Sequence, residues 1–115
     1  KKKYPLFKIK NKNIIFSNNS LEKDISKSKF VIYRGTSAVL NCVINHVYPI
    51  YLKDHNSLTV NILYAQKKNI SEITSFKDFK EIIDNENKYK VSNFLIFFAK
   101  KYFTQINFNI LKKFI

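Results

Sequence analysis

The residues best suited to chemistry in this sequence are Arg34 and Gly35, which stand next to each other. Arg34 is the only arginine among 21 basic residues, and Gly35 is the only glycine in the chain. Thr36 and Ser37 follow them and precede an apolar run with helical spacing. A guanidinium, two hydroxyls and the free N–H groups at the start of a helix suit the binding of phosphate. Residues 34–37 are therefore a candidate anion site.

A simpler interpretation of these residues stays open. Gly35 can serve only to permit a tight turn, and Thr36 or Ser37 can serve only to cap the helix. Ser37, Asn41 and Asn45 recur every four residues, so they form one polar stripe along the predicted helix. That stripe either faces a ligand or is the ordinary solvent side of the helix.

Asp54 and His55 form a second candidate pair, because they follow a predicted strand at the edge where parallel sheets bind ligands. The alternative is that they form only a polar turn. His46, His55 and Cys42 have no recognised metal-ligand spacing, and one glycine is too few for a phosphate loop or a dinucleotide fingerprint. We expect neither a metal nor a cofactor.

The elements that must position these residues alternate between strands and helices. Strands are predicted at Ile14–Phe16, Phe30–Tyr33 and Tyr48–Leu52, each short, apolar and followed by turn-forming residues. Helices are predicted at Ser20–Lys27, which Ser20 can cap, and at Ala38–Val47. The second helix is rich in β-branched residues, which also permit a strand. This order predicts an α/β fold with part of a Rossmann-like parallel sheet.

The rest of the chain is predicted to be mainly helical after a short stretch at Leu58–Tyr64. One helix begins after Ser75, a cap that Asp78 supports, and its expected core residues are Phe76, Phe79, Ile82 and Ile83. Another places Val91, Phe94, Leu95, Phe98 and Tyr102 on one face, and Phe108–Ile115 is a third. We expect one partial domain, with the Rossmann-like part in residues 1–64 and a helical region in residues 65–115.

The run Tyr33–Leu52 (YRGTSAVLNCVINHVYPIYL) resembles the donor-site signature of two-domain GT-B glycosyltransferases, especially bacterial enzymes of surface-polysaccharide synthesis. That signature is a strand, a Gly-Ser/Thr-Ser turn, a helix that often carries Glu or Gln, a Gly, and a strand opening with Pro-Ile or Pro-Val. Asn41 replaces the Glu, and His46 stands where the helix-ending Gly is usual. A histidine can adopt the required left-handed conformation with some strain.

The resemblance implies that the chain is part of a glycosyltransferase, with a nucleotide-diphosphate sugar as donor and an envelope polysaccharide or glycolipid as acceptor. Gly35, Thr36 and Ser37 would meet the diphosphate, Arg34 would supply positive charge, and Asn41 would take the ribose position. Asp54 and His55 would contact the sugar or the acceptor. In this family the general base normally comes from an N-terminal domain that this sequence does not contain, so we expect the piece alone to be inactive.

Composition leaves two other interpretations open. The formal charge of +13 suits nucleic acid or an anionic membrane, but the lysines are scattered, and the excess of Lys, Asn, Ile and Phe is typical of a low-GC coding sequence. A basic binding module would use residues such as Lys88, Tyr89, Lys90, Lys100, Lys101 and Tyr102. A non-functional remnant is the other alternative.

The expected location is the cytoplasm, with peripheral contact at the inner face of the membrane as an option. The apolar run Phe94–Ala99 is far too short to cross a bilayer. The single Cys42 excludes an internal disulfide and suits a reducing compartment. The chain has no methionine and begins with three lysines, so we expect it to be a piece of a longer protein.

Overall fold

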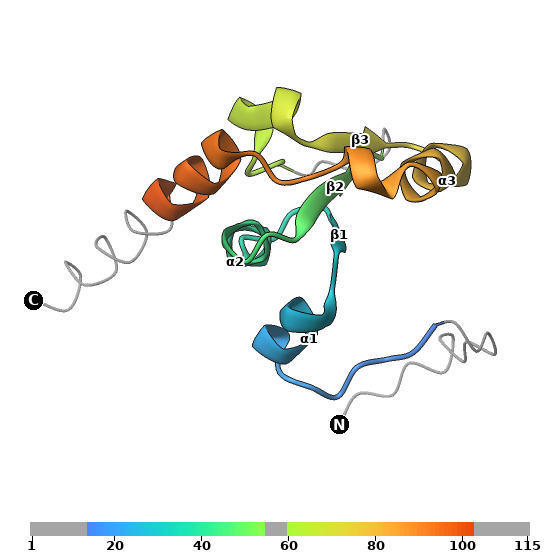
Figure 1. Cartoon of the computed structure of the whole chain (residues 1–115), viewed down its shortest axis with the longest axis horizontal. Coiled ribbons are helices and arrows are strands. Elements are labelled where there is room, and N and C mark those ends of the chain that lie inside the picture. The colour runs from blue at the N-terminus through green and yellow to red at the C-terminus, as the bar shows by residue number, and fades with distance from the viewer. Residues whose placement is uncertain (1–13, 55–59, 103–115) are drawn as a thin grey trace, which may run out of the picture.

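The computed structural model describes residues 14–54 and 60–102 (Figure 1). A further helix covers residues 93–102. The named elements, with η for a 3-10 helix, are α1 (Leu21–Lys27), β1 (Phe30–Tyr33), α2 (Ala38–Ile44), β2 (Tyr48–Leu52), η2 (Tyr64–Asn69), β3 (Ser71–Ile73), α3 (Phe76–Asp84) and η3 (Glu86–Lys88). The three strands form one parallel sheet in the order β1-β2-β3. This confirms the predicted α/β class, and the arrangement is consistent with part of a Rossmann-like fold.

One of the three predicted strands was wrong. Residues 14–16 are exposed and lie outside the sheet, whereas β3 supplies the third strand and pairs Leu52 with Ile73. The run at 14–16 has strand-forming residues, but strand propensity depends on a neighbouring strand and a buried face. Neither is present there in the described part of the chain. Because β3 lies within residues 65–115, the sheet continues past residue 64 into the region predicted to be helical.

Both faces of the sheet carry a buried cluster, as in most parallel sheets, but one face is covered only in part, because Ile32 of β1 is 49% exposed. Successive residues of β2 point to opposite faces, so Tyr51 joins one buried cluster while Tyr48 and Ile50 join another. The second cluster also contains Ile73 of β3 and Ile82 of α3. In Figure 1, α1 and α2 lie below the strands and α3 lies at the right.

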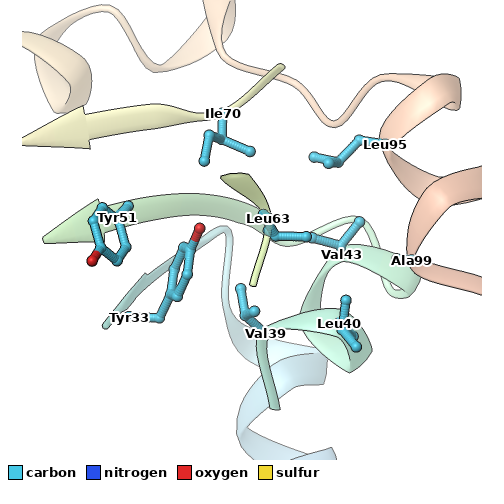
Figure 2. Close-up of a cluster of buried hydrophobic side chains, with 9 residues drawn as sticks. All are labelled: Tyr33, Val39, Leu40, Val43, Tyr51, Leu63, Ile70, Leu95 and Ala99. Carbon is cyan, nitrogen blue, oxygen red and sulfur yellow. The ribbon is translucent and has the colours of Figure 1, made fainter. Parts of the chain in front are cut away.

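The larger cluster joins the sheet to α2 and to the helix at 93–102 (Figure 2). The apolar face predicted for α2 is confirmed, because Val39, Leu40 and Val43 are buried. Each such side chain contributes roughly 1.5–3 kcal/mol when it leaves water. The buried members are Tyr33, Val39, Leu40, Val43, Tyr51, Leu63, Ile70, Leu95 and Ala99.

The predicted helix starts are confirmed. Ser20 Oγ accepts a hydrogen bond from the N–H of Lys23 at 3.3 Å, and Ser75 Oγ accepts one from Asp78 at 3.3 Å. The Asp78 carboxylate accepts from both the N–H and the hydroxyl of Thr74, at 3.0 and 3.1 Å. These bonds lower the pKa of Asp78, because they favour its ionised form.

Helix α2 ends at Ile44, three residues before the predicted end, and His46 has a φ of 65°, the left-handed conformation that the resemblance places at this position. The His46 N–H donates to the carbonyl of Val43 at 3.0 Å, and the Val47 N–H donates to that of Cys42 at 2.9 Å. This pair of bonds is a Schellman motif, which usually has glycine at the left-handed position. The motif turns the chain directly into β2.

Two phenylalanines that the sequence places in the core are exposed. Phe76, the first residue of α3, is 76% exposed, and its ring lies 6.3 Å from that of Phe79, which is itself only partly buried. Phe94 is 78% exposed, because the buried side of its helix is the side that carries Leu95 and Ala99. The predicted helix at 108–115 and part of the stretch at 58–64 lie outside the described residues.

Candidate functional site

The candidate site is at the carboxyl edge of the sheet, where the strands end next to each other. Arg34 directly follows β1, and Asp54 lies two residues after β2. The register pairs Tyr33 with Tyr51, so the two chain segments leave the sheet side by side. Ligands bind at this edge in open parallel sheets. The structure therefore brings Arg34 and Asp54 together at the edge predicted for ligand binding.

Arg34 is held near Asp54, but two of its three side-chain nitrogens make no hydrogen bond in the described part of the chain. Nη2 of Arg34 lies 3.7 Å from Oδ2 of Asp54, which is an ion pair longer than a hydrogen bond. Both Nε and Nη2 of Arg34 are buried and make no hydrogen bond in the described part of the chain. A buried N–H without an acceptor is costly, and a guanidinium is suited to grip two oxygens of a phosphate.

The two hydroxyl side chains in the turn between β1 and α2, those of Thr36 and Ser37, differ in their hydrogen bonds. Thr36 Oγ1 accepts a hydrogen bond from the N–H of Ala38 at 3.1 Å, so Thr36, one residue before the N-cap, satisfies the first N–H of the helix. Ser37 occupies the N-cap position, but its side chain makes no capping bond. Gly35 is exposed and its φ is not positive, so the turn does not need glycine for a left-handed backbone. Gly35 has no side chain that would cover the backbone at this turn.

Asn41 is oriented by its neighbour on the helix. Nδ2 of Asn45 donates to Oδ1 of Asn41 at 3.1 Å and to its backbone carbonyl at 2.8 Å. Ser37 and Asn45 are exposed and Asn41 is half-buried, so the polar stripe lies on the outer side of α2. His55, the remaining predicted site residue, lies outside the described residues.

Sequence reasoning missed a buried polar pair under the same edge. The hydroxyl of Tyr33, the last residue of β1, donates to Oδ1 of Asn61 at 2.6 Å. That oxygen also accepts from the N–H of Leu63 at 2.9 Å, while Nδ2 of Asn61 is buried without a partner. Burial raises the pKa of Tyr33. The one available signal was a lone polar residue inside the apolar run Val60–Leu63.

An acidic hollow lies elsewhere, between β3 and α3. Its volume is about 230 Å³, and the carboxylates of Glu72, Asp78 and Glu81 line it together with Ser71, Ile82 and Tyr89. Within residues 14–54 and 60–102, no three His, Cys, Asp or Glu residues are arranged to hold a metal ion. Negative charge makes this hollow unsuitable for a nucleotide.

The aromatic residues named for a basic binding module differ in exposure, because Tyr89 is half-buried and Tyr102 is 36% exposed. The Tyr89 ring packs against Tyr48 at 5.6 Å, and the Tyr102 ring packs against Phe98 at 5.9 Å. Cys42 is buried in a cluster with Ile25 and Val47, where it packs as a small apolar side chain. Burial raises the pKa of its thiol.

None of the helices described here has the length and apolar character needed to cross a membrane. Comparison of the chain with protein families, with curated proteins and with solved structures finds no match. The site must therefore be interpreted from its own geometry.

Proposed function

We propose that this chain is the donor-binding part of a glycosyltransferase, and that it holds the diphosphate of a nucleotide sugar at the carboxyl edge of its sheet. The observation that supports this most is the Arg34 guanidinium, which has two buried N–H donors free of hydrogen bonds beside the end of β2. The resemblance of Tyr33–Leu52 to a GT-B donor site supports the choice of ligand.

In this proposal Arg34 binds the leaving group of the transfer reaction. Displacement at the anomeric carbon of the sugar leaves negative charge on the nucleotide diphosphate. A fixed guanidinium stabilises that charge more in the transition state than in the ground state. Backbone N–H groups around Gly35 add further donors. The sugar passes to a saccharide acceptor, and the general base comes from a separate domain, as the resemblance implies.

Isothermal titration calorimetry of the chain with nucleoside diphosphates and sugar nucleotides tests the proposal. We expect saturable binding that Arg34→Ala weakens by about 1–3 kcal/mol, the range for a lost charge-assisted hydrogen bond. Arg34→Lys should recover only part of the loss, because an ammonium cannot bind two oxygens as a fork.

Lys29→Ala is the matched control for this titration. Lys29 precedes the amino end of β1 and forms a 3.6 Å ion pair with Glu86, so it carries a similar charge at the opposite end of the same strand. Its loss should leave the affinity nearly unchanged. An equal loss in both variants would indicate general electrostatic attraction, and no binding by the folded chain would refute the donor site.

A further inference from the structure

The helix at 93–102 presents an unusual outer side to solvent. Phe94 is 78% exposed and Phe97 is 63% exposed, and Lys101 is also exposed. Residues spaced by three, four and seven positions share one side of a helix, so these three side chains form one continuous strip. Leu95 and Ala99, both fully buried, lie on the other side. We call Phe94, Phe97 and Lys101 the outer helix face.

The stretch of sequence that carries the outer helix face has charged residues of one sign only. No aspartate or glutamate follows Glu86 in the sequence, whereas this part of the chain contains Lys88, Lys90, Lys100, Lys101, Lys112 and Lys113. Among the described residues, Lys88, Lys90, Lys100 and Lys101 are exposed. Two exposed phenylalanines, in a stretch of sequence whose charged residues are all lysines, combine an apolar surface with attraction to anions.

We propose that the outer helix face docks on an anionic lipid bilayer, with the helix lying in the membrane plane. Phenylalanine rings at this position can enter the boundary between headgroups and acyl chains, and each nearby lysine is attracted to anionic headgroups. A second copy of the chain is a poorer partner, because both surfaces would carry the same positive charge. Single-stranded nucleic acid is held in basic grooves, whereas these residues lie on the outward side of one helix.

This surface is independent of the candidate donor site. In Figure 2 the arrowheads of β2 and β3 point away from the helix that carries Leu95 and Ala99. Arg34 and Asp54 follow the carboxyl ends of β1 and β2, so the outer helix face lies toward the opposite end of the sheet. A lipid surface can therefore be tested without reference to sugar nucleotides.

Sedimentation of the chain with vesicles tests the proposal. We expect binding to vesicles of mixed phosphatidylglycerol and phosphatidylcholine, and much weaker binding to phosphatidylcholine alone. Phe94→Ser/Phe97→Ser should lower the partition coefficient at least about tenfold, because two buried rings are lost. Lys101→Gln should lower it about fivefold at low salt, since one lysine near an anionic surface contributes roughly that factor.

Phe76→Ser is the matched control, because Phe76 is 76% exposed on α3 and is therefore an equally exposed ring outside the proposed face. It should bind vesicles as the unmodified chain does, and circular dichroism should show the same fold for all variants. Equal losses from Phe76→Ser and Phe94→Ser/Phe97→Ser would overturn the proposal. The proposal would also be overturned if the chain bound a single-stranded oligonucleotide through Phe94 and Phe97 and did not bind anionic vesicles.

Discussion

The hydroxyl of Tyr33 donates a 2.6 Å hydrogen bond to Oδ1 of Asn61, a residue 28 positions further along the chain. The bond ties the last residue of β1 to the segment that leads into η2, and the Tyr33 ring packs against Tyr51 at 5.4 Å. Since Arg34 is the next residue after Tyr33, the buried pair also fixes the point from which the Arg34 side chain leaves the sheet.

The first prediction concerns this buried pair. Tyr33→Phe should lower the free energy of unfolding by about 1–2 kcal/mol, because Asn61 loses its strongest partner while staying buried. Tyr33→Phe/Asn61→Leu should be less destabilised than the sum of the two single variants, since both polar partners are then absent. Urea denaturation of the four chains measures this coupling, and strict additivity would show that the bond contributes nothing.

The second prediction concerns the left-handed residue that ends α2. His46→Gly should raise the free energy of unfolding by about 0.5–1 kcal/mol, because glycine relieves the strain at positive φ but adds flexibility to the unfolded chain. His46→Val should lower it by about 1–2 kcal/mol, because a β-branched residue is strongly disfavoured there. Thermal unfolding followed by circular dichroism ranks the three chains. A more stable valine variant would show that the turn is not left-handed.

The third prediction concerns pH. Hydrogen bonds from Thr74 lower the pKa of Asp78 in the folded chain, so the ionised carboxylate stabilises the fold at pH values above the ordinary aspartate range. That contribution is lost as the pH falls through the folded-state pKa. Asp78→Asn should therefore be less stable than the unmodified chain at neutral pH, and the difference should shrink in acid.

Asp84→Asn is the control for Asp78, because it removes the same charge from the other end of α3. Asp84 also forms an exposed 3.8 Å ion pair with Lys80, but such pairs contribute little and a negative charge near a helix C-terminus is unfavourable, so this variant should lose little stability at neutral pH. Urea midpoints measured from neutral to acid pH give both comparisons. If the difference in urea midpoint between Asp78→Asn and the unmodified chain stayed constant with pH, the link between the lowered pKa of Asp78 and stability would be contradicted.

Local signals were enough to predict most of the fold. Ser20 and Ser75 begin the helices they were expected to begin, and His46 adopts the left-handed conformation expected at the end of α2. These features depend on a few neighbouring residues. The third strand was predicted at residues 14–16, but the structure has β3 in its place. Which segment pairs with β2 depends on contacts between distant parts of the chain, and no local pattern contains that information.

The candidate site was predictable only in part for the same reason. Arg34 and Asp54 were identified because each follows a recognisable strand, and parallel strands end at one edge. Asn61 was missed because its role comes from a partner 28 residues away. Phe94 was assigned to the core because helical spacing alone does not show which of two adjacent apolar residues faces inward.

The last prediction concerns Asp54, whose carboxylate lies 3.7 Å from Nη2 of Arg34. A bound diphosphate would compete with this carboxylate for the guanidinium and would be repelled by its charge. Asp54→Asn should therefore raise the affinity for inorganic pyrophosphate by up to about fivefold, the factor that corresponds to the roughly 1 kcal/mol of a partly exposed ion pair. Asp24→Asn, a change on α1, should leave the affinity unaltered. Calorimetric titration in low salt measures both. Weaker binding after Asp54→Asn would mean that Asp54 positions Arg34 for the ligand rather than competing with it.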